Sequence, residues 1–204
     1  MLDKFIAKHL SKPRGISGRF VSFFMNRQNR RIYEKTVDIL AVNDGESILD
    51  IGCGNGFVLN MIAQKHKGSF TGIDISESII AAAKQRNRTY IENGIMQFEC
   101  QNLSEMGFES GSFDKVYTIN TVYFWENLES TMAEIKRVLK PGGVFINTVF
   151  SNETLDRFSF TKIGYKRFTR EQLTKAGIDA GFYLEIVPIL NGFANCYFYR
   201  KKVN

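Results

Sequence analysis

Apolar and polar positions divide the chain into a helical first part, a regular middle part and a distinct end. Residues 1–45 show helical spacing of apolar side chains, most clearly between Phe20 and Leu40. Loop signals interrupt this part at residues 12–15 and at Ser17-Gly18. Short apolar runs then alternate with helical patterns. The predicted strands are residues 47–51, 69–73, 96–100, 115–119 and 144–149, and the predicted helices are 56–65, 76–83 and 131–139.

Strands that alternate with helices predict parallel crossovers, and therefore a doubly wound sheet with helices on both faces. The chain ends differently, with a helical pattern over 169–180 and two apolar runs, 183–190 and 194–200, around Asn191-Gly192. Asn-Gly between apolar runs indicates an antiparallel hairpin. We therefore predict an α/β fold with a mostly parallel, seven-stranded sheet that ends in this hairpin. The predicted division is a helical cap, 1–45, and one domain, 46–204.

The composition is that of an ordinary globular protein. Of 204 residues, 44% are hydrophobic and 24% are charged, so the chain can bury one substantial core. No apolar run reaches the roughly 18 residues that span a bilayer, and charges close to Met1 break any secretory pattern. Cys53, Cys100 and Cys196 are widely spaced and odd in number. They indicate reduced thiols in a cytoplasmic protein, without a disulfide framework or a metal site.

The net charge of +6 leaves two interpretations open. Much of the excess lies before residue 36, and a second basic group lies at residues 200–202. Such segments can bind nucleic acid or an anionic substrate, or they can be a solvated surface. The distribution favours the solvated surface, so nucleic acid is the weaker expectation.

The most informative stretch is a glycine-rich turn after the first predicted strand. Gly52, Gly54 and Gly56 alternate there. Glycine lets the backbone bend sharply and removes the Cβ atoms that keep a ligand from the main chain. The following helix offers unpaired amide groups at its N-terminus. A glycine-rich turn can also be present only because the backbone needs its conformation, without binding a ligand. The acidic residues beside it are therefore needed to choose between the two interpretations.

Two carboxylates flank this turn. Asp50 precedes the first glycine, and Asp74 ends the second predicted strand. A carboxylate in the position of Asp74 can accept hydrogen bonds from both ribose hydroxyls of an adenosine cofactor. Asp50 would repel a pyrophosphate but would attract the ammonium group of an amino-acid-bearing nucleoside. The pair therefore favours S-adenosylmethionine over NAD.

The segment resembles motif I of the class I S-adenosylmethionine-dependent methyltransferases, which is an acid followed by G-x-G-x-G. Asp50 and the three glycines match this pattern. Three more motifs of the family follow in order: Gly72–Ser76 resembles the acidic second-strand motif, Phe113–Val116 the F-D-x-V motif, and Leu139–Gly143 the L-K-P-G-G motif. The resemblance covers about residues 45–150 and is closest to the small-molecule type of the family.

The resemblance also implies a set of cofactor-binding residues, which end or follow the first four predicted strands: Asp50, Gly52, Cys53, Gly54, Gly56, Asp74, Ile75, Asn102, Leu103 and Asn120. Asp50 and the turn would hold the methionine part, Asp74 the ribose and Ile75 one face of the adenine. Asn102 and Leu103 stand where the family usually has an acid, which is a departure. Asn120 would lie near the carboxypropyl group and the methyl. Loop capping is the alternative for both asparagines.

The chemistry of methyl transfer does not require a catalytic base for a good nucleophile, because the protein mainly aligns the reactants and excludes water. No catalytic residue is therefore assigned, and Tyr123, Tyr33 and His9 are weak candidates. Packing is an equal alternative for both tyrosines and for Trp125. A solvated position is the stronger interpretation of His66.

Signatures of specialised acceptors are missing from the sequence. No Asn/Asp-Pro-Pro-aromatic run follows the fourth predicted strand, no cysteine follows a proline, and no acids cluster for magnesium. We therefore expect a small-molecule acceptor, enclosed by the N-terminal cap and by Phe158, Phe160 and Tyr165. Three alternatives stay open: an RNA or protein methyltransferase that uses the basic segment, a non-catalytic cofactor-binding module, and an NAD-dependent dehydrogenase, which Asp50 disfavours.

Overall fold

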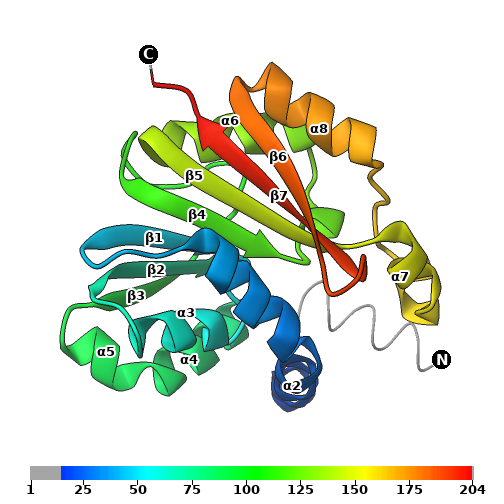
Figure 1. Ribbon diagram of the computed structural model, residues 1–204. Helices are drawn as coiled ribbons and strands as arrows, with labels where there is room; N and C mark the ends of the chain where they lie inside the picture. The colour runs from blue at the N-terminus through cyan, green and yellow to red at the C-terminus, as the bar shows by residue number, and fades with distance from the viewer. Residues whose placement is uncertain (1–14, 204) are drawn as a thin grey trace.

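A seven-stranded sheet forms the centre of the computed structural model, which describes residues 15–203 and, within helix α2, side chains from residue 27 onward. The strand order is β3-β2-β1-β4-β5-β7-β6 (Figure 1). The strands are β1 (Glu46–Ile51), β2 (Gly68–Asp74), β3 (Met96–Cys100), β4 (Phe113–Ile119), β5 (Leu139–Phe150), β6 (Phe182–Ile189) and β7 (Ala194–Lys201). The first five are parallel, and β7 is antiparallel to β5 and β6. The predicted fold class is confirmed.

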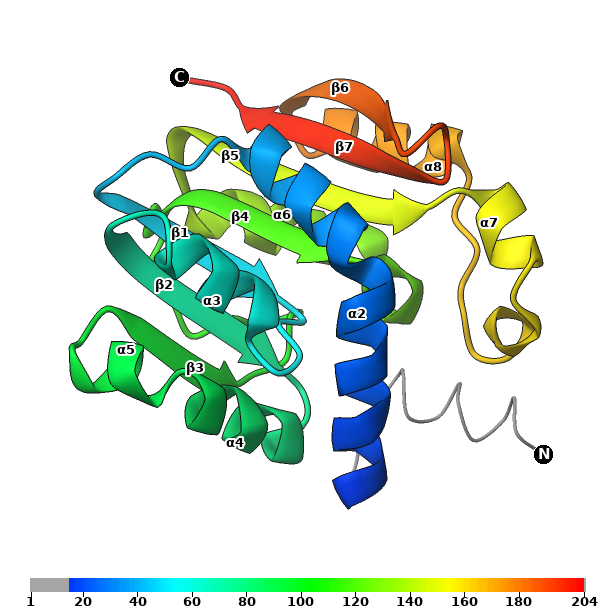
Figure 2. The same cartoon turned by 60° about the horizontal axis from the view of Figure 1, so that its bottom comes forward.

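Helices cover both faces of the sheet (Figures 1 and 2). One face carries α2 (Gly15–Leu40), α3 (Phe57–Ala63), α4 (Glu77–Arg86) and α5 (Arg88–Glu92), and the other carries α6 (Leu128–Val138) and α8 (Arg170–Asp179). Three short elements lie near the carboxyl ends of β4 and β5: the 3-10 turns η1 (Val122–Phe124) and η2 (Ser159–Lys162), and α7 (Asn152–Asp156). In open α/β sheets, ligands bind beyond the carboxyl ends of the strands. The loops that contain these short elements therefore lie where a binding site is expected.

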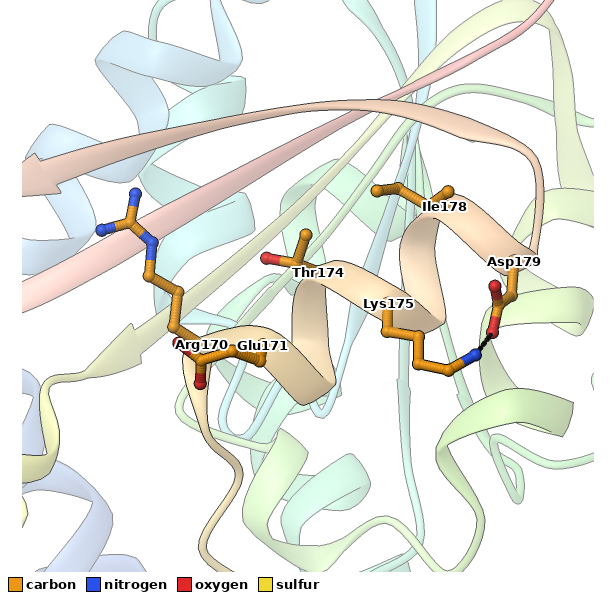
Figure 3. A pocket seen from close by; sticks show the side chains of 6 residues that line it. All are labelled: Arg170, Glu171, Thr174, Lys175, Ile178 and Asp179. Carbon is orange, nitrogen blue, oxygen red and sulfur yellow. Dashed lines mark hydrogen bonds and ion pairs between the residues drawn. The ribbon is translucent and has the colours of Figure 1, made fainter.

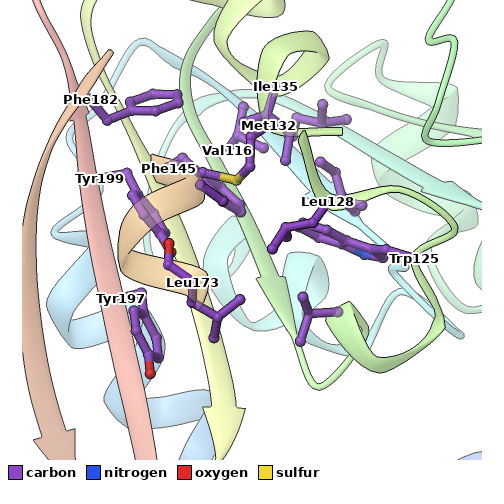
Figure 4. Close-up of a cluster of buried hydrophobic side chains, with 14 of the residues drawn as sticks. Val116, Trp125, Leu128, Met132, Ile135, Phe145, Leu173, Phe182, Tyr197 and Tyr199 are labelled. Carbon is purple, nitrogen blue, oxygen red and sulfur yellow. The ribbon is translucent and has the colours of Figure 1, made fainter. Parts of the chain in front are cut away.

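Each face of the sheet has its own apolar core, because successive side chains of a strand point to opposite faces. Figure 4 shows the core under α6 and α8, where Phe145 of β5 stacks on Tyr199 of β7, with 5.3 Å between the ring centroids. Ile146, the next residue along β5, belongs to the other core, with Leu59 of α3 and Leu40 of α2. Burial on both faces explains why these strands read as nearly continuous apolar runs.

Helix α2 is longer and more continuous than predicted. It runs through Ser17-Gly18, so the loop expected there is wrong, whereas residues 12–14 lie outside the described part. A single glycine costs about 1 kcal/mol in a helix, which the packing of Ile32 and Leu40 in the core outweighs. The second half of α2 crosses the sheet, and its first half continues past it (Figure 2). The division at residue 45 stays a prediction.

The chain after α6 also departs from prediction. Residues 140–143 were expected to stop the helix before a strand at 144; α6 does end just before them, at Val138, but β5 begins already at Leu139. Phe113 of β4 pairs with Leu139, and Lys115 pairs with Val144, so the intervening residues form an irregularity within the strand. The predicted hairpin is present: Ile189 pairs with Ala194, and Asn191 and Gly192 have φ of 56° and 79°. Positive φ at both positions matches the Asn-Gly preference of a tight hairpin turn.

Candidate functional site

The glycine-rich turn follows β1 at the carboxyl end of the sheet. Gly52, Gly54 and Gly56 all have positive φ, of 69°, 54° and 69°, which glycine adopts at the least cost. The backbone N–H groups of Gly52 and Cys53 donate to the carbonyl of Ile73, at 2.8 and 3.0 Å. These bonds hold the turn against the end of β2, next to Asp74.

The three glycines differ in what surrounds them. A Cβ on Gly52 would lie 2.5 Å from Cγ2 of Thr121, and one on Gly56 would lie 2.5 Å from Nδ2 of Asn87. Around Gly54 no atom of the described chain lies within 4 Å of such a Cβ. Gly52 and Gly56 therefore permit close packing of the protein on itself, whereas Gly54 leaves open space in which a ligand can approach the main chain.

Asp74 lies directly beside this open space. Its Oδ2 accepts a hydrogen bond from the N–H of Gly54 at 3.2 Å, and its Oδ1 accepts one from the N–H of Ser76 at 3.0 Å. Burial raises the pKa of Asp74, while the hydrogen bonds from Ser76 and Gly54 oppose that rise. Each carboxylate oxygen has a second lone pair left for a ligand donor. Ile75 is 45% exposed, so its apolar side chain is available to a ligand.

Asp50 is the second carboxylate at the turn, and only 3% of it is exposed. The hydroxyl of Tyr117 donates to its Oδ2 at 2.7 Å. Burial raises the pKa of Asp50 to about 7; Tyr117 opposes the rise, and the negative charge of Asp74 adds to it. Burial also raises the pKa of Tyr33, on α2, to about 12, and the charge of Asp50 contributes. A cation at this point would relieve the cost of ionising Asp50.

Tyr117 is a site residue that the sequence did not reveal. It pairs with Asp50 across β1 and β4, and this register is a tertiary property with no local signal. Cys53 takes part in the turn through its backbone, and its side chain is buried below it: a Cβ on Gly72 would lie 2.9 Å from the sulfur. Burial raises the pKa of the Cys53 thiol, so the thiol stays protonated.

Asn120 follows β4 with φ of 57°. It lies next to the turn, because the neighbouring Thr121 packs against Gly52. Its Oδ1 accepts hydrogen bonds from the N–H of Phe150 at 3.1 Å and from the hydroxyl of Tyr123 at 3.2 Å. Its Nδ2 is buried and has no hydrogen-bond partner within the described part of the chain. A buried donor of this kind is unusual and needs an explanation.

The other predicted residues are placed less centrally. Asn102 is exposed, and its Oδ1 accepts from the N–H of Ser104 at 3.1 Å, which is loop capping. Leu103 is partly buried against the core under α6. Trp125 is 5% exposed in that core (Figure 4), and its Nε1 donates to Thr121 at 3.3 Å. His9 lies outside the described residues, so its possible role as a base stays a prediction.

Seven aromatic rings lie close to one another beside Asn120. They come from η1, the end of β5, the segment after β5 and the turn between β6 and β7. We call them the aromatic row, and each lies 5.2–6.3 Å from the next by ring centroid: Phe193, Phe150, Phe158, Phe160, Tyr165, Tyr123 and Phe124. Most of them are only partly buried. Burial raises the pKa of Tyr123 and of Tyr165, so both phenols stay protonated near neutral pH.

A separate surface depression lies on the outer side of α8 (Figure 3). It is lined by residues of that helix alone, including Arg170, Ile178 and the ion pair of Lys175 with Asp179. It contains none of the residues of the turn. Within residues 15–203, no helix is long and apolar enough for a bilayer, and no three His, Cys, Asp or Glu side chains gather as metal ligands.

The sequence matches a family model described as a methyltransferase domain over residues 49–147. It is 35% identical over 114 residues to a 24-methylenesterol C-methyltransferase of Arabidopsis thaliana, which covers 56% of this chain and 32% of the relative. It is 29% identical over 157 residues to the sterol 24-C-methyltransferase of Saccharomyces cerevisiae, covering 77% of this chain and 40% of that protein. The chain thus spans well under half the length of these relatives.

Solved structures share the whole fold. A chain from a complex with the Trm112 methyltransferase activator of Haloferax volcanii superposes with a TM-score of 0.81 at 20% identity, covering 98% of both chains. Geranyl diphosphate C-methyltransferase of Streptomyces coelicolor reaches 0.73 at 14% identity, over 96% of this chain and 87% of its own. The family match, with the glycine turn and its two carboxylates, identifies residues 49–147 as a domain of the class I S-adenosylmethionine-dependent methyltransferase family, and the solved structures show the same fold.

Proposed function

We propose that this chain binds S-adenosylmethionine at the glycine-rich turn and transfers its methyl group to a small, apolar acceptor. The observation that carries the proposal is the pair of carboxylates around a bend whose middle glycine faces open space. A pyrophosphate would meet two negative charges there. A zwitterionic nucleoside with an ammonium group would find a carboxylate for the ammonium and another for the ribose.

The residues present fit this cofactor. Asp74 accepts the ribose hydroxyls with its remaining lone pairs, Ile75 covers the adenine, and Gly54 lets the methionine part approach the backbone. Asp50 lies below the turn and attracts the ammonium, which favours its ionised form. When bound, S-adenosylmethionine supplies an activated methyl group on a sulfonium. The chain then orients the acceptor and excludes water.

The aromatic row supports an apolar acceptor. Most of its rings are half-buried, three of them lie in the segment that follows β5, and Tyr123 contacts Asn120, next to the turn. Flat apolar surfaces bind rigid apolar molecules and need few polar groups to orient them. The phenols of Tyr123 and Tyr165 stay protonated, so neither of them can act as a base. The proposed acceptor is therefore a nucleophile that needs no activation by a phenolate. The sterol methyltransferases among the relatives support the same class of acceptor.

Helix α2 supports the proposed N-terminal cap. Tyr33 is close enough to Asp50 for the charge of that carboxylate to raise its pKa, and its ring centroid is 5.9 Å from that of Phe57, at the start of α3. The first half of α2 continues past the sheet on the side of the carboxyl ends (Figure 2). Helix α2 would therefore cover the cofactor and the acceptor. The nucleic-acid alternative gains no support from this arrangement.

Calorimetric titration with S-adenosylmethionine tests the cofactor. We expect a dissociation constant near the micromolar range, about −8 kcal/mol. Asp74→Ala should cost about 1.5–3 kcal/mol of binding free energy, as for hydrogen bonds to a charged group. Asp179→Ala, which removes an exposed acid on α8, is the matched control and should bind like the wild type. Equal affinity of Asp74→Ala and wild type would contradict the ribose assignment.

Transfer of labelled methyl groups tests the acceptor. The chain is incubated with labelled S-adenosylmethionine and separate pools of sterols, linear isoprenoids, water-soluble amines and RNA. We expect label in an apolar pool, and less of it with Phe158→Ala, which interrupts the aromatic row between Phe150 and Phe160. Label in RNA alone would discard the apolar acceptor while leaving the cofactor site intact.

A further inference from the structure

The segment between α7 and α8 carries a dense group of positive charges. Residues 157–170 read RFSFTKIGYKRFTR, with five cations and no acid. All five cationic residues are exposed: Arg157, Lys162, Lys166, Arg167 and Arg170. This is a third basic group, besides those before residue 36 and at residues 200–202. Such a group attracts an anionic partner unless nearby acids neutralise it.

Nearby acids neutralise little of this charge. Of the five cations, Arg167 is the one that forms an ion pair within residues 15–203, with 3.2 Å between its Nη1 and Oδ1 of Asp156. Nζ of Lys166 donates to the carbonyls of Trp125 and Glu126, at 2.7 and 2.8 Å. These carbonyls anchor the segment to the loop before α6, but they carry no net charge. Most of the charge is therefore available to a partner.

Large apolar side chains alternate with these cations. Phe158 and Phe160 are partly exposed, and Ile163 is 36% exposed and belongs to neither core. Gly164 has φ of 73°, and no atom of the described chain lies within 4 Å of a Cβ added to it. Residues 162–164 therefore form a protruding tip. A single exposed apolar residue is ordinary, but this one lies at a tip among cations and two half-exposed rings.

This mixed basic and apolar surface lies on the side of the candidate site. Figures 1 and 2 show α7 and the coil after it beyond the carboxyl ends of β4 and β5. The rings of Phe158, Phe160 and Tyr165 follow one another in the aromatic row, which reaches Tyr123 beside Asn120. One segment therefore carries both the exposed cations and part of the proposed acceptor site.

We propose that residues 157–170 dock the protein on the surface of an anionic lipid bilayer, with Ile163 inserted between the lipid head groups. Basic side chains are attracted to an anionic leaflet, and apolar side chains among them gain by burial in the interface. RNA would also attract the cations, but the aliphatic Ile163 offers no flat face for a base to stack on. The combination therefore favours lipid.

Docking on a bilayer would also bring the site to its acceptor. Small apolar molecules partition into the hydrocarbon of a bilayer, and the aromatic row continues from the docking segment toward Asn120. This step rests on the proposed function, whereas the docking itself does not.

Cosedimentation of the full chain with vesicles tests the docking, without cofactor or acceptor. Vesicles of phosphatidylcholine alone are compared with vesicles that contain about a third phosphatidylglycerol, at about 0.1 M salt. We expect at least tenfold stronger binding to the anionic vesicles. The double variant Arg157→Gln, Lys162→Gln should weaken this binding about tenfold, and Ile163→Ser about threefold.

The matched control is the double variant Lys65→Gln, Lys67→Gln. It removes two exposed lysines before β2, at the amino end of that strand, and it lowers the net charge by the same amount. It should change binding to anionic vesicles less than twofold. Equal losses in the two double variants would mean that net charge alone is responsible and would overturn the proposal.

Two further outcomes would contradict the docking. Unchanged binding by Ile163→Ser would overturn the insertion of that side chain. Binding of a single-stranded RNA probe at the same salt concentration, without binding to anionic vesicles, would replace the lipid partner by nucleic acid. Neither assay contains S-adenosylmethionine, so a failure of docking leaves the proposed function intact. Failure of the cofactor to bind in calorimetry would likewise leave the docking intact.

Discussion

At the residue scale, Asp50 combines a cost in folding with a use in binding. It is 3% exposed, and the titratable groups that it interacts with among the described side chains are all acidic: Asp74, Tyr117, Tyr33 and the Cys53 thiol. Its raised pKa, about 7, means that ionisation is unfavourable in the free protein. A buried group whose charge lowers the stability of the fold is common at sites where that charge binds a ligand. Removing the charge should therefore separate the two effects.

Asp50→Asn should raise the free energy of unfolding at pH 8. The pKa of Asp50 is higher in the folded chain, from 3.8 to about 7. Its contribution to stability is therefore full below about pH 4 and is lost as the pH rises to about 7. We expect the variant to gain about 1–4 kcal/mol at pH 8, because Asn still accepts the bond from Tyr117 but carries no charge. Denaturant unfolding at several pH values measures this.

The gain of Asp50→Asn over the wild type should shrink steadily from pH 8 to pH 5. The same variant should bind S-adenosylmethionine more weakly than the wild type at pH 8. A pH-independent difference in stability would show that the charge of Asp50 is not its cause.

At the element scale, the five residues of the glycine turn serve both the packing of the fold and the binding of a ligand. Gly56 lets the chain pack against Asn87 and Phe98, whereas Gly54 has open space where a side chain would be. All of its glycines have positive φ, so any substitution carries a backbone cost of about 1 kcal/mol. The three positions differ in the steric cost of an added side chain. A substitution at Gly56 should therefore lower the stability of the fold, whereas one at Gly54 should affect mainly ligand binding.

Gly54→Ala and Gly56→Ala form a matched pair. A Cβ at Gly56 would lie 2.7 Å from Cζ of Phe98, so we expect a loss of about 2–4 kcal/mol in unfolding free energy. Gly54→Ala should lose only about 1 kcal/mol, yet it should weaken S-adenosylhomocysteine at least tenfold. Thermal unfolding and calorimetry measure the two effects. Equal destabilisation by both substitutions would contradict the division of roles.

At the scale of the whole molecule, α2 joins the core of the sheet to the site. Ile32 and Leu40 pack in the same core as β1 and β2, and the hydroxyl of Thr36 bonds that of Thr148 on β5 at 2.9 Å. Tyr33, on the same helix, is partly buried, and the charge of Asp50 contributes to its raised pKa. A ligand at the turn would therefore contact residues from several elements and should stabilise the fold as a unit.

S-adenosylhomocysteine should raise the free energy of unfolding by about 2.7 kcal/mol when present at about 100 times its dissociation constant. For a chain of this size that corresponds to roughly 5–10 °C in Tm. Asp74→Ala, at the same ligand concentration, should gain only about 0.3–1.3 kcal/mol, because its dissociation constant is higher. Differential scanning fluorimetry over a ligand series measures this. A shift that is equally large in Asp74→Ala would mean that the ligand binds elsewhere.

Several parts of the molecule were predictable because they depend on neighbours in sequence. Strand and helix periods are local, as are the glycine turn, the acid at the end of β2 and the Asn-Gly hairpin. The errors lie in the bounds of two elements: α2 passes through Ser17-Gly18, and β5 begins at Leu139 rather than at residue 144. In β5 the local turn signal is kept, because Gly142 has φ of 74° and residues 140–143 form an irregularity against β4. Pairing with β4 on both sides of this irregularity adds Leu139 to the strand, and no local signal predicts that pairing.

The sequence by itself determined the fold class, the family and the two carboxylates of the turn, because each depends on residue types at short spacing. Only the tertiary structure decided that Tyr117 bonds Asp50 and that Phe150 and Tyr123 orient Asn120. These contacts depend on the register of β4 with β1 and on the course of the chain after β5. Hydrogen bonds act over about 3 Å, so they form only once packing has placed distant segments side by side.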